Sequence, residues 1–135
     1  MKIKNLLVST IVVFIFIFIF EFLFHGILLK DLYLQTSNLW RTENEMQQYF
    51  PWAIICQIIG ALIISLIYLQ KHENKGWTEG LRFGAIIGSL LGVTVFGFYA
   101  YMPIPLILAS AWLVGSLIEV TSVGIILSLI NLQKK

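Results

Sequence analysis

Long apolar runs separated by short polar segments make up almost the whole chain. Four runs are long enough to cross a hydrocarbon core of about 30 Å, which takes roughly 20 helical residues. We expect transmembrane helices at about residues 5–29, 52–70, 80–101 and 104–132, within a single domain that covers residues 1–135. The first run contains FIFIFIF, from Phe14 to Phe20, which alternates with the period of a strand. Its length favours a helix, because a helix satisfies its own backbone in lipid and an unpaired strand does not.

Composition agrees with a lipid environment. Of the 135 residues 59% are hydrophobic and 12% charged, against roughly 25% charged in ordinary soluble domains. Lys2 and Lys4 precede the first run, as in a secretory signal, but the run is longer than a typical signal core and no cleavage site follows, so we expect it to be retained. The predicted class is an all-α, multi-pass membrane protein with four transmembrane helices in a bundle.

The connections between the runs differ in length and character. The longest, residues 30–51, contains TENE (Thr42–Glu45), a capping box that predicts a short interfacial helix. This outer segment either anchors the chain to the membrane surface or covers an outward-facing pocket. Pro103 and Pro105 end the third run and restart the chain, so the last two spans form an antiparallel hairpin. His72, in the turn-rich KHENKGWTE, is expected to be a solvated loop residue.

The basic residues predict the orientation. Two of them, Lys30 and Arg41, fall on one side of a four-span chain. The other seven fall on the opposite side: Lys2, Lys4, Lys71, Lys75, Arg82, Lys134 and Lys135. Because cytoplasmic loops carry the excess of Lys and Arg, both termini should be cytoplasmic. The net charge of +2 then reflects topology and gives no reason to expect nucleic acid as a partner.

Small residues repeat at four-residue spacing in the last two spans. Such stripes let helix backbones approach closely, either within one chain or between copies in a homo-oligomer or with another membrane protein. A path for a solute lined by glycine is the alternative. The predicted packing residues are Gly80, Gly84, Gly88 and Gly92 in the third span, and Ala111 and Gly115 in the fourth.

Four polar side chains inside the spans are the candidate site. Glu21 and His25 share a face of the first helix, and Gln57 is expected at a similar depth on the second, so the three should form an outer cluster. Glu119 is expected separately, roughly 22 Å below Ile104 and toward the cytoplasmic half. Ionisable groups in membrane spans commonly form ligand or proton pathways, which suggests a relay across the bilayer. The alternative is that they are hydrogen-bonded groups that hold helices together.

Cofactor and enzyme signals are weak. The only other histidine, His72, falls on the opposite side of the membrane, so one chain cannot supply two histidines to a haem, and we predict no metal or cofactor. A metal held by Glu21 and His25 from two copies is the alternative. Cys56 is the single cysteine, which excludes an internal disulfide. Motifs of soluble enzymes are absent, so an enzyme is less favoured than a binding protein.

The motif KGWTEGLRFGAIIG (Lys75–Gly88), together with His25, Tyr33 and Trp40 after the first span, resembles a family of small four-span bacterial membrane proteins of unknown function. That resemblance implies a four-helix fold in the bacterial cytoplasmic (inner) membrane and no particular activity. From the residues we expect binding or translocation of a small solute or proton through the bundle interior. The alternative is a non-catalytic accessory subunit of a larger complex, with the glycine stripe as its docking face.

Overall fold

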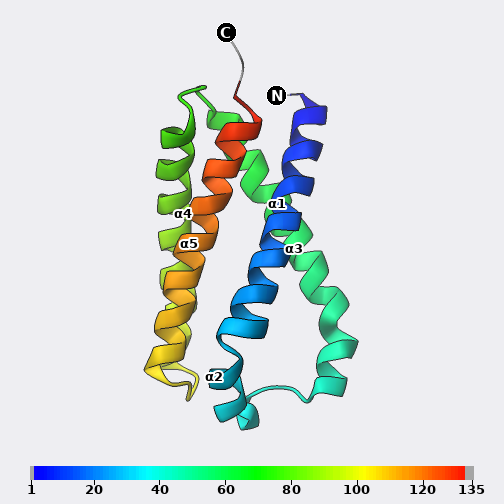
Figure 1. Cartoon of the computed structure of the whole chain (residues 1–135), viewed down its shortest axis with the longest axis vertical. Coiled ribbons are helices and arrows are strands. Elements are labelled where there is room, and N and C mark those ends of the chain that lie inside the picture. Colours follow the sequence, from blue (N-terminus) through cyan, green and yellow to red (C-terminus); the bar gives the residue numbers. More distant parts are fainter. Residues whose placement is uncertain (1, 133–135) are drawn as a thin grey trace.

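The computed structural model describes residues 2–132, and over that range it contains helices and no strand (Figure 1). The predicted all-α class is confirmed. Four helices are long and apolar enough to cross a membrane. The elements, in order, are α1 (Ile3–Leu23), the π-helical turn η1 (Phe24–Leu28), α2 (Lys30–Gln35), the 3₁₀ turn η2 (Ser37–Leu39), α3 (Glu43–Lys71), α4 (Trp77–Phe96), the 3₁₀ turn η3 (Gly97–Ala100) and α5 (Leu106–Ile130).

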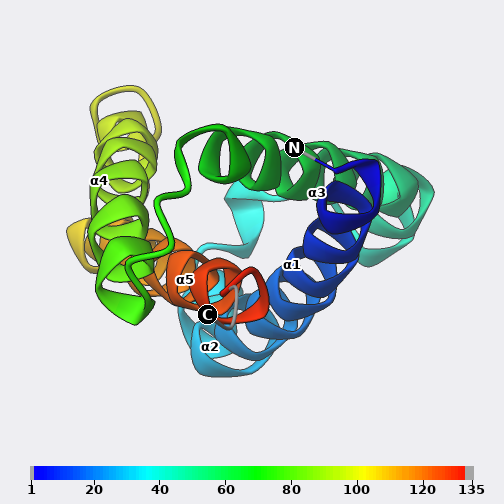
Figure 2. The same cartoon turned by 90° about the horizontal axis from the view of Figure 1, so that it is seen from above.

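The helices stand side by side in the order α3, α1, α5, α4 (Figure 2). Helix α1 begins and α5 ends at the same end of the bundle, which we call the terminal end (Figure 1). The opposite end carries α2, the following connection to α3, and the turn between α4 and α5, and we call it the loop end. A buried apolar core lies between these ends and is centred on Val13, Ala61, Val123 and Leu127.

Helices α4 and α5 form the predicted hairpin, and glycines set their separation. The four α4 glycines named from the sequence are all buried. A Cβ atom added to Gly84 would lie 2.4 Å from the carbonyl oxygen of Val120 and 2.6 Å from Cα of Thr121. Side chains would therefore keep the backbones apart, and their absence permits the close contact typical of small-residue interfaces.

Of the small residues of α5, Gly124 faces this contact, but the predicted packing residues Ala111 and Gly115 do not. The α4 glycines meet α5 backbone at positions that include Leu113 and Leu117. Ala111 and Gly115 are each offset by two residues from those positions, which turns them by about 200° around the helix axis. Gly115 instead lies under the ring of Phe24, 2.4 Å from where its Cβ would be. The four-residue repeat predicted the spacing of the stripe but not the helix face on which it lies.

The second span begins earlier than predicted. The capping box is present: Thr42 N–H donates to Glu45 Oε2 at 2.9 Å, and Glu45 N–H donates to Thr42 Oγ1 at 3.4 Å. The helix that it starts is not a separate short one, because α3 continues through Pro51 to Lys71. Proline removes one helical hydrogen bond, but residues 41–53 are exposed, so the freed carbonyl is not buried. The short helix of this segment is α2.

The terminal end is fastened by a polar network, and His72 is at its centre rather than in solvent. Its side chain is 12% exposed, with Nδ1 3.1 Å from Glu79 Oε1 and Nε2 3.2 Å from the Asn131 carbonyl oxygen. The Asn131 amide donates to the fully buried Ser9 hydroxyl at 2.9 Å, and the Tyr68 hydroxyl lies 3.1 Å from His72 Nδ1. This terminal-end network joins all four long helices.

Candidate functional site at the loop end

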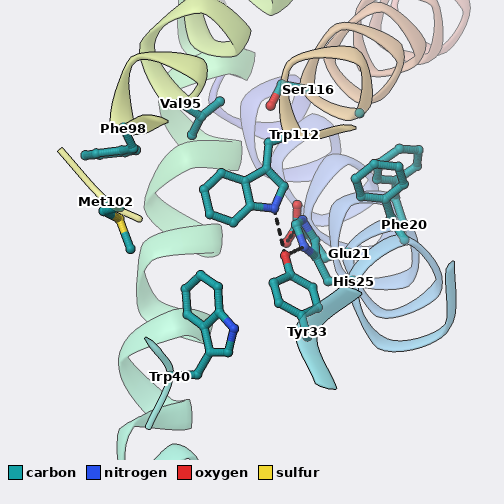
Figure 3. A pocket seen from close by; sticks show the side chains of 12 residues that line it. Phe20, Glu21, His25, Tyr33, Trp40, Val95, Phe98, Met102, Trp112 and Ser116 are labelled. Atoms are coloured by element: carbon teal, nitrogen blue, oxygen red, sulfur yellow. Dashed lines mark hydrogen bonds and ion pairs between the residues drawn. The ribbon is translucent and has the colours of Figure 1, made fainter. Parts of the chain in front are cut away.

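A cavity of about 420 Å³ lies at the loop end, where α1, α2, α5 and the end of α4 meet. Figure 3 shows Trp112, Tyr33, His25 and Glu21 converging on it, with Trp40 and Phe98 on the other walls. Most of the wall is aromatic. The lining residues are Phe20, Glu21, Phe24, His25, Tyr33, Trp40, Val95, Phe98, Met102, Trp112, Gly115 and Ser116.

A chain of polar contacts runs along one wall of this loop-end cavity. Trp112 Nε1–H donates to the Tyr33 hydroxyl at 2.8 Å, and that hydroxyl lies 2.5 Å from His25 Nδ1. On the other side of the ring, His25 Nε2 lies 3.5 Å from Glu21 Oε2. The expected contact between Glu21 and His25 is therefore present, and the structure extends it by two residues that sequence reasoning did not place there.

An indole N–H can only donate, so the Tyr33 oxygen accepts from Trp112. Burial raises the pKa of the Tyr33 hydroxyl to about 12, so the phenol keeps its proton. The direction of the bond between Tyr33 and His25 follows the tautomer of the ring. In the tautomer with its hydrogen on Nε2, Nδ1 accepts from Tyr33 and Nε2–H points to the Glu21 carboxylate.

Local backbone structure aims these groups. His25 lies in the π-helical turn, in which Leu29 N–H bonds the Phe24 carbonyl oxygen five residues back, at 2.9 Å. Such turns insert an extra residue into a helix and often occur at functional sites. Helix α2 follows directly, and its Tyr33 side chain contacts His25. Its last turn is closed by Thr36, whose hydroxyl accepts from Trp40 Nε1–H at 2.9 Å.

Glu21 also borders a second cavity, of about 260 Å³, between α1 and the loop-end half of α3. Gln57 and Phe50 line this side cavity from α3. Gln57 Oε1 is buried and has no hydrogen-bond partner among residues 2–132. Gln57 therefore faces the space beside Glu21, as expected, but makes no direct bond to it.

Glu119 lies near the middle of α5 and lines neither cavity. Its Oε1 atom is buried and has no hydrogen-bond partner in the described part of the chain. That Glu119 belongs to a separate polar set in the other half of the bilayer stays a prediction.

No hydrogen bond within residues 2–132 joins the loop-end cavity to the terminal-end network. The apolar core around Val13 and Val123 lies between them. Ser65, between the core residues Ala61 and Tyr68 of α3, is fully buried and its hydroxyl has no hydrogen-bond partner in that range. The two histidines lie at opposite ends, as expected from the order of the spans. Within residues 2–132, no three His, Cys, Asp or Glu side chains are grouped so that they could hold a metal ion. Cys56 is exposed on α3.

The chain matches no protein-family model, no curated protein and no solved structure. The resemblance noted in the sequence therefore adds nothing to the geometry. What the fold and the site define is a class: a small four-helix membrane protein with an aromatic cavity at one end and a carboxylate, a histidine and a tyrosine on its wall.

Proposed function

We propose that this protein binds a small solute in the loop-end cavity and exchanges a proton with it through Glu21 and His25. The observation that carries the proposal is the cavity itself. Its volume of about 420 Å³ falls in the range of roughly 300–1,000 Å³ found for small-molecule sites, which are mainly apolar with a few converging polar groups. Ionisable residues inside membrane spans are commonly functional.

The structure supports binding from one side in this conformation. The cavity reaches Glu21 and, through it, the side cavity, while the terminal end is closed by the apolar core and by the His72 network. Translocation then requires the terminal end to open after the solute has bound. Rocking of one helix pair against the other around a fixed central site would provide this, as in transporters with alternating access.

We further propose that the protein is in a bacterial cytoplasmic membrane with the terminal end in the cytoplasm. The seven-to-two excess of Lys and Arg at that end supports this orientation. In a Cys56→Ala background, Asn44→Cys should react with an impermeant maleimide in intact cells, and Glu73→Cys only after permeabilisation. The reverse labelling pattern would overturn the orientation and leave the cavity facing the cytoplasm.

The test of solute binding is a thermal-shift screen of the purified protein against small cations, anions and neutral compounds. A ligand present at about 100 times its Kd should stabilise the folded state by roughly 2.7 kcal/mol. Ser116→Phe, which fills the cavity, should abolish this shift. Ser89→Phe makes the same change on the exposed face of α4 and should not. Failure of every compound, or hits that survive Ser116→Phe, would contradict the proposal.

Proton exchange has its own measurement. In vesicles that contain a trapped pH dye, a compound found in the screen should move protons through the wild-type protein, and Glu21→Gln should abolish the signal.

The accessory-subunit alternative is less favoured, since its docking face was the glycine stripe, and those glycines are already packed against α5.

A further inference from the structure

We infer that the solute of the loop-end cavity is a small organic cation with an apolar or aromatic body. This inference rests on the proposed function and deepens it by naming the class of ligand. Three features of the cavity carry it: a carboxylate with no Lys or Arg on the walls, the aromatic side chains, and a buried acceptor beside Glu21 that has no donor.

The charge around the cavity is negative and has no fixed counter-ion. Glu21 lines the walls of both cavities. No Lys or Arg is among the residues that line either cavity, and the one basic side chain beside Glu21 within residues 2–132 is His25. A carboxylate in a low-dielectric site is costly without a partner, and a bound cation or a proton relieves that cost.

His25 does not neutralise Glu21. In the tautomer with its hydrogen on Nε2, Nδ1 accepts from Tyr33 and the one N–H of the ring points to Glu21. A neutral ring orients the carboxylate without cancelling its charge. The buried Oε1 atom of Gln57, which lines the side cavity together with Glu21, is an acceptor that has no donor within the described residues. Such an acceptor suits a ligand that brings hydrogen-bond donors or positive charge.

The walls have the chemistry that binds organic cations. The aromatic residues Tyr33, Trp40, Phe98 and Trp112 line the cavity from α2, the connection before α3, η3 and α5. The two indole rings lie 6.1 Å apart at 62°, and Trp40 meets Tyr33 edge to face at 5.4 Å. The rings therefore differ in orientation around the cavity. Aromatic faces attract cations through their quadrupoles, Trp most strongly, and this attraction grows when water is excluded.

An inorganic ion does not fit this site as well. Small metal ions need several oxygen or nitrogen ligands at short distances, and the described residues offer no such group. A neutral solute would leave the Glu21 carboxylate uncompensated. An anion would meet repulsion from Glu21. An alkylammonium or similar cation satisfies both the carboxylate and the aromatic faces.

The test uses three probes of matched shape: benzyltrimethylammonium, its neutral carbon analogue neopentylbenzene, and the anion benzenesulfonate. Trp52 and Trp77 are exposed and lie outside the cavity, so Trp52→Phe/Trp77→Phe protein reports on Trp40 and Trp112 by fluorescence. Titrations are made in detergent micelles, with protein-free micelles to correct for partitioning. We expect saturable binding of the cation at least tenfold tighter than that of either other probe.

Substitutions at Glu21 assign the preference to the cavity. Glu21→Gln should weaken cation binding at least tenfold and leave binding of the neutral probe unchanged, while Glu21→Asp keeps the charge and should retain most of the affinity. Glu43→Gln removes the same charge from the exposed first turn of α3 and should have no effect. Circular dichroism of each variant verifies folding. If Glu21→Gln does not fold, Trp112→Phe, which weakens the aromatic wall, should reduce binding of the cation more than that of the neutral probe.

The outcomes separate the two proposals. Equal or tighter binding of the neutral or anionic probe would overturn the cation inference and leave solute binding intact. If no probe binds, the cation inference fails. In that case a ligand of another class from the thermal-shift screen, lost in Ser116→Phe, would preserve the proposed function, and an empty screen would remove both.

Discussion

Replacing Gly84 by alanine tests how close α4 and α5 are. The added Cβ would lie 2.4 Å from the Val120 carbonyl oxygen, 1.0 Å short of the 3.4 Å at which ordinary contact begins. Its three nearest neighbours are backbone atoms of Val120 and Thr121. Backbone cannot move aside by a rotamer change, so the helices themselves must separate.

The expected cost follows from this overlap. Overpacking in a well-packed core costs about 1–3 kcal/mol, and we take the upper value because the obstacle is backbone. Alanine recovers about 1 kcal/mol of helix propensity relative to glycine. The net loss of unfolding free energy for Gly84→Ala is therefore about 2 kcal/mol. Gly60→Ala meets no atom within 4 Å and should be neutral or stabilising by up to about 1 kcal/mol.

The assay is reversible unfolding in mixed micelles at increasing mole fractions of dodecyl sulfate, followed by circular dichroism. The two variants should differ by about 3 kcal/mol, or roughly a hundredfold in the unfolding equilibrium. Gly88→Ala is a graded control, since its Cβ would lie 3.2 Å from α5 backbone and needs only a small adjustment. Equal stability of Gly84→Ala and Gly60→Ala, or a larger loss at Gly88 than at Gly84, would refute the close contact.

Three further predictions concern the terminal-end network, the cap of α3 and the hydrogen bond between Tyr33 and Trp112. His72→Ala should destabilise the protein by about 2 kcal/mol in the same assay, because it removes the contacts of the ring with Glu79 and with the Asn131 carbonyl oxygen. An unchanged midpoint would contradict a structural role of His72. Thr42→Ala should lower the free energy of unfolding by about 1 kcal/mol, because it removes the α3 cap. Hydrogen exchange should become faster in the first turn of α3 and not in its centre. An equal increase in both parts of the helix would contradict the role of the cap. Tyr33→Phe removes the acceptor of the Trp112 N–H, so one of the four indole N–H signals should move upfield in a proton–nitrogen NMR spectrum, and four unshifted signals would contradict this hydrogen bond.

Local patterns in the sequence account for most of the helices. The four long apolar runs, the prolines between the last two spans and the Thr42 capping box each predicted an element that is present. These signals are local, because the hydrophobic length of a span and the side-chain hydrogen bonds of a cap depend on neighbours in the chain. The predicted start of the second span was wrong for the same reason, because a proline such as Pro51, judged from its neighbours alone, indicates a helix boundary.

The tertiary structure decided which face each helix turns toward its neighbours and which side chains contact one another. The sequence placed Glu21 and His25 on one helix face, and the fold supplied Tyr33 from α2 and Trp112 from α5, which is 79 positions away from Tyr33. A one-turn π-helix contains His25, and no local pattern in the sequence predicted that turn.

The properties that follow from the composition of the chain differ from those that depend on contacts between the helices. The repeat of small residues, the apolar lengths and the scarcity of charge are properties of the chain, and they determined that it forms membrane-spanning helices with at least one close pair. Which glycines meet which backbone, that Gly115 lies under Phe24, and that His72 is held by Glu79 and Asn131 depend on how the helices are rotated and tilted. The rotation of each helix about its axis is set by its packing against the rest of the bundle. No single segment of the sequence therefore determines it, and it is defined only when all four helices are packed together.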